Sequence, residues 1–443
     1  MPLFSEDREK LLGHPEAEHR FYHKIGSADA LLISYAEHNG SYTAAFKNLS
    51  IWMPCEFVFY NGTLNQTRFA GGNHMGSLLI KNGTVVTATD RYQADVYIEG
   101  ETVSMIGTRL DVSADREIDA SGCYLFPGGI DAHTHMELPF MGTHASDSFE
   151  SGTLAGLHGG TTTIIDFAIQ TQGDSLESAL ETWHKKADGH AVGDYAFHCA
   201  VTDFNDNTRK EIPTVINDHG INSFKIFMAY KGALMIDDRQ MYELMEVLVE
   251  HGGIMTAHTE NGDVIDSKIQ KNLEAGNTAP KYHVLSRPAI CEAEAAGRAI
   301  DISYQTGCPF YIVHATCEET LARVKAATLR NQKVHVETCI QYLLLDDSYY
   351  FKDGFEGAKV VMSPPLRKKK DQEALWAGIN QNLVHHVATD HCPFCMQQKE
   401  MGKDNFSKIP NGAPGVENRF ELLYSEGVAK GRIGLNKFVE MSS

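Results

Sequence analysis

The sequence predicts an α/β protein, a (β/α)8 TIM barrel with a small, incomplete β-sandwich domain. Three observations predict this fold. Eight short apolar runs follow one another between residues 125 and 390, most gaps between them hold an amphipathic helical segment, and polar residues stand on or next to five of the runs. A doubly wound open sheet is the runner-up, but no glycine segment has the GxGxxG or Walker spacing of a phosphate-binding loop.

Length and charge exclude several classes of protein. The chain has 443 residues and a formal net charge of −19, which argues against nucleic acid as a partner because phosphate binding needs a basic surface. No apolar run reaches the length of a membrane span, and the first thirty residues lack an apolar signal core. The 9 cysteines are scattered and odd in number, which favours free thiols in a reducing compartment. We therefore expect a cytoplasmic protein without membrane partners.

The chain divides into three regions. Residues 1–74 show no sustained alternation of strands and helices, no family resemblance and no recognisable chemistry, so they form an unassigned N-terminal extension with one capped helix near residues 5–12. Residues 75–123 begin a small β domain: MGSLLIKNGTVV, with Asn82-Gly83 as its turn, predicts a hairpin, and strands are expected at 95–98 and 102–106. Residues 124–443 form the barrel.

The barrel strands are expected at the eight apolar runs. These are LFPGGID (125–131), TTTIIDFA (161–168), DYAFHCAV (194–201), SFKIFMA (223–229), GIMTAHTE (253–260), FYIVHAT (310–316), KVHVETC (333–339) and LVHHVATD (383–390). Amphipathic helices are expected between them, for example at residues 239–251 and 292–307. The basic run LRKKKD (366–371) predicts a solvated helix start.

Six polar residues are placed on five of these strands. His133 and His135 follow the first, Lys225 lies in the fourth, His258 and His314 end the fifth and sixth, and Asp390 ends the eighth. Barrel active sites form at the carboxyl ends of the strands, so these side chains should converge. Two histidines two residues apart on an extended chain face the same side and can bind one metal ion, while histidines from adjacent strands can bind a second. Asp390 offers a carboxylate to a metal, or a base beside it.

Lys225 needs a separate explanation. A free ammonium is positively charged at neutral pH and cannot bind a cation. The residue fits a metal site if carbon dioxide has carboxylated it, because the resulting carbamate is an anion with two oxygens that can bridge two metals. The alternative is an ordinary buried ion-pair lysine.

Simpler interpretations apply to single residues. A lone histidine at a strand end is more often hydrogen-bonded or at the surface, and we interpret His144, His158, His184 and His190 in that way. Cys392 and Cys395 form a CxxC that resembles a redox or zinc half-site, but the sequence has no second CxxC. Chance explains the full set of four histidines, one lysine and one aspartate at five strand ends far less easily.

The motifs, taken in order, resemble those of a known family. They are GGIDAHTHMELPFMGT, DFAIQ, SFKIFMAYKG, AHTEN, VHAT, VHVETCIQYLLLD, VVMSPPLR, ATDHCPF and PNGAPGVE. From Met75 to the C-terminus the chain resembles the dihydropyrimidinase / D-hydantoinase family, which are cyclic amidohydrolases of the amidohydrolase superfamily.

The resemblance implies a role for each matching residue. His133, His135 and Asp390 would bind the more buried of two zinc ions, and His258 and His314 the more exposed one. Lys225, as N6-carboxylysine, and a hydroxide would bridge the two. Tyr230 would hydrogen-bond the oxyanion, Ser363 and Asn411 would orient the ring, and the pocket for the substrate's side group would be lined by Leu138, Pro139, Phe140 and Met141.

The implied reaction opens the ring amide of 5,6-dihydropyrimidines or hydantoins to N-carbamoyl amino acids, as in pyrimidine catabolism. The bridging hydroxide attacks, and Asp390 carries its proton to the leaving nitrogen. The family also implies a homo-oligomer, a tetramer. One alternative is another cyclic amidohydrolase such as an allantoinase. Another is a non-catalytic scaffold relative, but such proteins have lost metal ligands that are present here.

The sequence departs from the family pattern at two places. Ile340 stands where the family usually has proline. The family's segment after the eighth strand, which returns to the small β domain, is not found. We therefore expect the small sheet to lack its C-terminal partner strands, to expose an edge, and to weaken the oligomer contacts.

Overall fold

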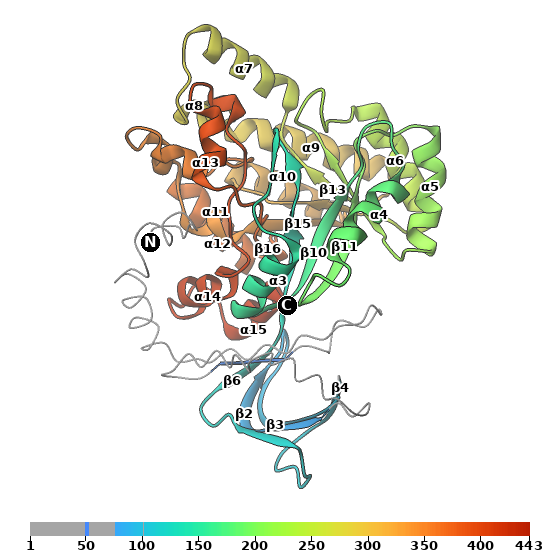
Figure 1. Cartoon of the computed structure of the whole chain (residues 1–443), viewed down its shortest axis with the longest axis vertical. Helices are drawn as coiled ribbons and strands as arrows, with labels where there is room; N and C mark the ends of the chain where they lie inside the picture. The colour runs from blue at the N-terminus through green and yellow to red at the C-terminus, as the bar shows by residue number, and fades with distance from the viewer. Residues whose placement is uncertain (1–48, 53–75, 101) are drawn as a thin grey trace.

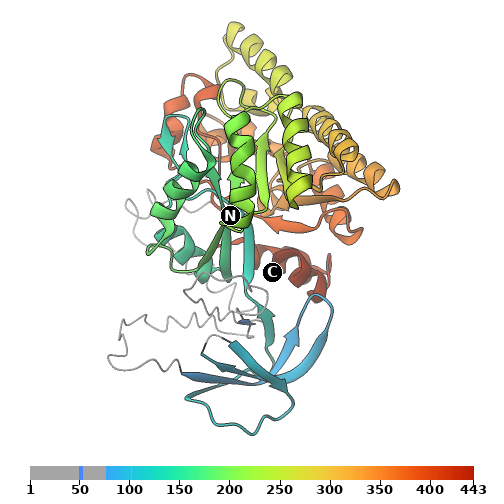
Figure 2. The ribbon, with the colours of Figure 1, turned by 90° about the vertical axis from the view of Figure 1, so that its right-hand side faces the viewer.

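The computed structural model describes residues 49–52, 76–100 and 102–443 (Figure 1). The helix expected near residues 5–12 lies outside these ranges. A small β-sheet lies below a larger body in which helices surround a central set of strands, and a second view, turned by 90°, shows the same two parts (Figure 2). Among the described residues, no helix is long and apolar enough to span a membrane.

The larger body is the predicted (β/α)8 barrel. Its eight strands are all parallel and neighbour one another in chain order. They are β7 (Gly129–Thr134), β10 (Thr161–Ile169), β11 (Asp194–Ala200), β12 (Ser223–Phe227), β13 (Ile254–His258), β14 (Phe310–Ile312), β15 (Val334–Cys339) and β16 (His386–Ala388). The residues after β16 close the circle, because His391 bridges Thr134 of β7 and its N–H donates to His133 O at 3.3 Å.

Helices between the strands form the outer layer (Figure 1). They are α3 (Phe149–His158), α4 (Leu176–Ala187), α5 (Asp206–Asn217), α6 (Asp238–His251), α7 (Gly262–Glu274), α8 (Lys281–Ser286), α9 (Ala289–Thr306), α10 (Glu318–Leu329) and α12 (Lys369–Asn380). The helices expected at 239–251 and 292–307 are α6 and α9. A capping box at Asp237 starts α6, and Gly252 in a left-handed conformation ends it.

Shorter elements complete the barrel domain. They are β8 (Pro139–Phe140), β9 (Thr143–His144), α11 (Ile340–Leu344), α13 (Met396–Lys399), α14 (Arg419–Leu423), the 3-10 turns η2 (Asp347–Phe351), η3 (Glu356–Val360), η4 (Glu400–Gly402) and η5 (Phe406–Lys408), the π-helical turn η6 (Tyr424–Val428), and α15 (Leu435–Ser442). Ile340, the residue that departs from the family pattern, begins α11 and is buried.

The small sheet has six strands in the described residues. They are β1 (Leu49–Trp52), β2 (Ser77–Val86), β3 (Arg91–Glu99), β4 (Thr102–Gly107), β5 (Arg116–Asp119) and β6 (Tyr124–Pro127). The strands expected at 95–98 and 102–106 are parts of β3 and β4. β1 comes from the segment left unassigned and pairs antiparallel with β6.

Two expectations about this region were wrong. Asn82-Gly83 is not a hairpin turn but an irregularity within β2, where the pairing with β3 shifts and Asn82 adopts a φ of 62°. The run LFPGGID is not one barrel strand, because β6 joins the small sheet and β7 begins the barrel after Gly128. Apolar runs alone cannot show which sheet a strand joins.

The C-terminal helix α15 lies between barrel and small sheet (Figures 1 and 2). Its Phe438 packs edge-on against Phe126 of β6, with ring centroids 5.3 Å apart. Asn436 Nδ2 donates to the carbonyls of Thr87 and Asp90 in the β2–β3 turn, at 2.8 and 3.0 Å. The helix therefore fixes the small sheet to the barrel.

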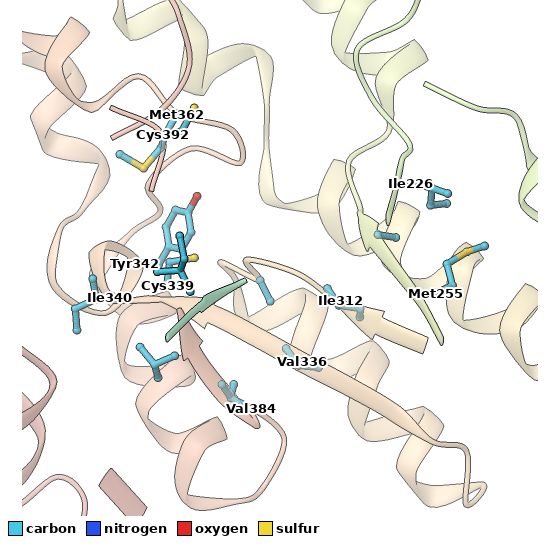
Figure 3. Packing of buried hydrophobic residues seen from close by; sticks show 14 of the residues in the cluster. Ile226, Met255, Ile312, Val336, Cys339, Ile340, Tyr342, Met362, Val384 and Cys392 are labelled. Carbon is cyan, nitrogen blue, oxygen red and sulfur yellow. The ribbon is translucent and has the colours of Figure 1, made fainter. Parts of the chain in front are cut away.

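Buried apolar side chains fill the barrel domain (Figure 3). Ile226, Met255, Ile312 and Val336 come from four successive strands, β12 to β15, and are almost completely buried. Strands covered on both faces are typically apolar throughout, and His133, His258 and Asp390 are polar exceptions at or just beyond the carboxyl ends of their strands. This arrangement leaves one rim of the barrel for chemistry.

The basic run 366–371 is only partly the solvated helix start that we expected. Lys369 and Lys370 are exposed at the start of α12, but Arg367 is buried and pairs with Glu292 at 3.1 Å. A run of basic residues in the sequence does not show whether one of them forms a buried ion pair in the folded protein.

Candidate active site

The six residues predicted at the strand ends lie together at one rim of the barrel. His133 Nε2 and His135 Nε2 approach Asp390 Oδ1 at 3.1 and 3.2 Å. His258 Nδ1 and His314 Nε2 are 3.0 Å apart, and Lys225 Nζ lies 3.1 Å from His133 Nε2. Ligand atoms of His133, His314 and Asp390 also lie within 4.8 Å of one another, so the two histidine pairs are adjacent.

His133 is oriented by a buried carboxylate. Its Nδ1–H donates to Glu337 Oε1 at 2.7 Å, which leaves Nε2 facing Asp390. Burial and Lys225 lower the pKa of His133, but Glu337 and Asp390 outweigh them and raise it. This position therefore favours a positive charge beside the imidazole, either a proton or a metal ion.

His258 is oriented in the same way by a second carboxylate. Its Nε2–H donates to Glu260 Oε2 at 2.9 Å, so Nδ1 keeps its lone pair toward His314. Arg287 Nη1 pairs with the same Glu260 oxygen at 2.6 Å. Although burial opposes it, Arg287 and His258 lower the pKa of Glu260 to about 2, which keeps the carboxylate charged.

Asp390 is an ionised carboxylate in a partly buried setting. Burial alone would raise its pKa, but the charge and hydrogen bonds of His133, together with His135, hold it well below the ordinary value. Asp390 has a φ of 51°, His314 of 42° and Tyr230 of 65°. Such left-handed backbone costs a non-glycine residue roughly 1–3 kcal/mol and clusters at functional sites.

Lys225 is buried, and among the described residues no carboxylate lies within hydrogen-bond distance of its Nζ. Its Nζ lies over the rings of Phe167 and Phe227, 4.3 and 5.1 Å from their centroids. Burial lowers its pKa to about 8. Lys225 therefore does not form an ordinary ion pair with a carboxylate in this part of the chain. Its neutral amine, the form that reacts with carbon dioxide, is more populated than that of an exposed lysine.

The donor set fits metal ions. Ligand atoms of a tetrahedral zinc site lie roughly 3.3 Å apart, because each Zn–N bond is about 2.0–2.1 Å long. The distances from Asp390 to His133 and His135, 3.1 and 3.2 Å, and the distance of 3.0 Å between His258 and His314 are close to this value. Burial holds the pKa of His314 well below its ordinary value, so its imidazole is a neutral ligand.

The residues predicted to contact substrate lie next to this cluster. The Tyr230 ring packs against His258, with centroids 5.3 Å apart, and against Phe140 at 5.5 Å. Burial raises the pKa of Tyr230 to about 12, so its hydroxyl is a hydrogen-bond donor. Ser363 and Asn411 both interact with Tyr230, and Asn411 Nδ2 donates to Ser363 Oγ at 3.1 Å.

Phe140 belongs to the loop 138–141, where we expected a pocket for the substrate's side group. Pro139 and Phe140 form β8, which pairs with β9 as a short hairpin. Leu138 is buried, whereas Pro139 is exposed and Phe140 and Met141 are half-buried. The T-shaped contact of Phe140 with Tyr230 places this hairpin at the site.

The carboxylates that orient the histidines were not predicted from the sequence. Glu337 lies in VHVETC and Glu260 in AHTEN, both within predicted strands. A glutamate within a predicted barrel strand is the sequence signal that could have found Glu337, which is fully buried in the structure. Arg287, between α8 and α9, carries no such signal.

Comparison with known proteins agrees with this fold. The amidohydrolase family model matches residues 124–443. The chain belongs to the amidohydrolase family, and within it to the dihydropyrimidinase / D-hydantoinase group. D-hydantoinase from Geobacillus stearothermophilus is 49% identical over 366 residues, which cover 82% of this chain and 78% of that protein.

Solved structures give the same grouping. The crystal structure of dihydropyrimidinase from Brevibacillus agri has a TM-score of 0.82 and 48% identity, and the match covers 83% of this chain and 80% of that one. The L-hydantoinase (dihydropyrimidinase) from Arthrobacter aurescens has a TM-score of 0.74 at 26% identity, with the same coverage of both chains.

A second family model, NADPH-dependent FMN reductase, matches residues 1–76. No family resemblance was expected in this segment. Apart from β1 and Gly76, the matched residues lie outside the described ranges, and none of the site residues belongs to them.

Proposed function

We propose that this protein opens the ring amide of 5,6-dihydropyrimidines or hydantoins to N-carbamoyl amino acids, using two zinc ions. The observation that carries the proposal is the convergence of four histidines and Asp390 on two adjacent positions, with carboxylates behind His133 and His258. The similarity to D-hydantoinases and dihydropyrimidinases supports the substrate class.

In this proposal His133, His135 and Asp390 would hold one ion, and His258 and His314 would hold the other. Lys225, carboxylated by carbon dioxide, would supply an anionic ligand to these ions in place of a buried cation. When bound, the two ions polarise the ring carbonyl and lower the pKa of the attacking water.

The protein's own residues move the protons and hold the ring. Asp390 accepts the proton of the attacking water and delivers it to the leaving ring nitrogen, which requires the carboxylate to be ionised at the start, as its low pKa provides. The hydroxyl of Tyr230 donates to the developing oxyanion. Ser363 and Asn411 orient the ring, and residues 138–141 face its side group.

Two related features belong to the same proposal. The family resemblance supports a homo-oligomer, a tetramer, acting in the cytoplasm on a small-molecule substrate. A non-catalytic scaffold role is disfavoured, because all six candidate metal-site residues are present and brought together.

A substrate panel tests the proposal. The whole chain, expressed with zinc and bicarbonate, is assayed with dihydrouracil, a 5-monosubstituted hydantoin and allantoin, and the N-carbamoyl products are measured by chromatography. We expect turnover of the first two. Turnover of allantoin alone would indicate the other cyclic amidohydrolase, and a metal-loaded protein inactive on all three would contradict the proposal.

A further inference from the structure

A buried lysine outside the candidate metal cluster contacts the two segments that carry Ser363 and Asn411. Lys399, the last residue of α13, is 2% exposed. Its ammonium donates to the carbonyl oxygens of Val361 at 2.8 Å, Pro410 at 2.7 Å and Gly412 at 2.8 Å. An ammonium has three N–H donors, so these bonds use all of them.

The acceptors are placed where the substrate contacts are proposed. Val361 precedes Ser363 by two residues, and Pro410 and Gly412 flank Asn411 on both sides. The two segments are also joined directly, since Gly412 N–H donates to Val361 O at 3.0 Å and Asn411 Nδ2 to Ser363 Oγ at 3.1 Å. Lys399 therefore ties together the backbone on both sides of this pair.

The position of Gly412 shows how little freedom the second segment has. Gly412 adopts a φ of 153°, and a Cβ there would lie 2.1 Å from the carbonyl oxygen of Cys392. Cys392 follows Asp390 by two residues. A shift of the 410–412 backbone would thus move Asn411 relative to both Ser363 and the strand end that carries Asp390.

We propose that Lys399 is a positioning residue that holds segments 361–363 and 410–412 in the geometry needed to bind the ring, without touching the substrate itself. Three charge-assisted hydrogen bonds are suited to this task, because they are short and directional and their acceptors are backbone atoms that fix the chain path. The inference rests on the proposed function for its effect on turnover.

The test compares Lys399→Met with Lys403→Met. Methionine has a side chain of similar length to lysine but donates no hydrogen bond. Lys403, four residues further on, is exposed and serves as the control position. We expect Lys399→Met to raise KM for dihydrouracil roughly tenfold or more, the effect of losing charge-assisted hydrogen bonds, with a smaller change in kcat and unchanged zinc content. Lys403→Met should match the wild type.

Amide hydrogen exchange gives a readout that does not depend on turnover. Peptides containing residues 361–363 and 410–412 should exchange faster in Lys399→Met and not in Lys403→Met. If Lys399→Met does not fold, Lys399→Gln, which retains two N–H donors, replaces it and should show a rise in both KM and exchange over the wild type.

The two ideas fail in different ways. The positioning role would be overturned if a folded, zinc-loaded Lys399→Met variant showed unchanged hydrogen exchange and an unchanged KM. It would also be overturned if the variant lost zinc while its KM stayed unchanged. An inactive wild type would contradict the proposed function, whereas faster exchange in the variant would still support the contacts made by Lys399.

Discussion

One hydrogen bond at His133 decides which ring nitrogen is left to bind a metal. Glu337 Oε1 accepts from His133 Nδ1 at 2.7 Å and from the His314 backbone N–H at 3.1 Å, while Oε2 accepts from the Tyr311 hydroxyl at 3.0 Å. Glu337 thus connects the two candidate metal positions through the strands that carry them. Carboxylates behind metal-binding histidines typically tune metal affinity.

Replacing Glu337 should weaken metal binding. Glu337→Gln keeps the shape but removes the charge that favours a cation at His133, so we expect zinc affinity to fall roughly 10- to 100-fold. Competition with a chromophoric chelator measures this. Glu318→Gln, at an exposed position, is the control. A zinc affinity equal to that of the control variant would show that Glu337 contributes packing but does not favour metal binding.

Asp390 has two proposed roles that one substitution can separate. Asp390→Asn retains an oxygen for the metal but cannot accept the proton of the attacking water, so zinc content should remain while kcat falls about 10²- to 10⁴-fold. Steady-state kinetics and metal analysis on the same sample measure both. Full turnover in this variant would remove Asp390 from proton transfer.

At the scale of the elements, the strands of the barrel were predictable because their apolar runs are short and most are separated by amphipathic helical segments. The convergence of His133, His258 and Asp390 followed from a general property of parallel barrels, whose carboxyl strand ends share one rim. The barrel fold and the candidate metal cluster could therefore be predicted from the sequence alone.

Other features depend on tertiary contacts that no local pattern records. Asn82-Gly83 has the composition of a turn, yet the surrounding sheet accommodates it within β2. Arg367 looks like part of a solvated run until Glu292 is brought beside it from α9. The carbonyl contacts of Lys399 are also invisible in sequence, because their acceptors are backbone atoms.

The junction after α3 depends on one glycine. A Cβ at Gly159 would lie 1.7 Å from the carbonyl oxygen of Glu417, so Gly159→Ala should destabilise the fold by about 1–3 kcal/mol and lower the midpoint of thermal unfolding by several degrees. Gly297→Ala in α9 is the control, since its Cβ meets only the flexible Arg323 side chain at 3.4 Å. Equal midpoints for both variants would contradict this packing.

At the scale of the whole molecule, the site rests on contacts between distant parts of the chain. The residues after β16 close the barrel onto β7, and α15 joins the barrel to the small sheet. His133 and Asp390, which share a candidate metal position, are brought together only by this closure. Metal binding should therefore stabilise the complete barrel, because ions that bind only the folded state shift the unfolding equilibrium.

The central claim is a pair of zinc ions held with the help of a carboxylated Lys225. The most direct test is zinc stoichiometry, measured by atomic emission on the whole chain and on Lys225→Ala, both loaded with zinc and bicarbonate. We expect about two zinc ions per wild-type chain, and we expect Lys225→Ala to lose both the zinc pair and the ring-opening activity. Two zinc ions per chain in Lys225→Ala would contradict it.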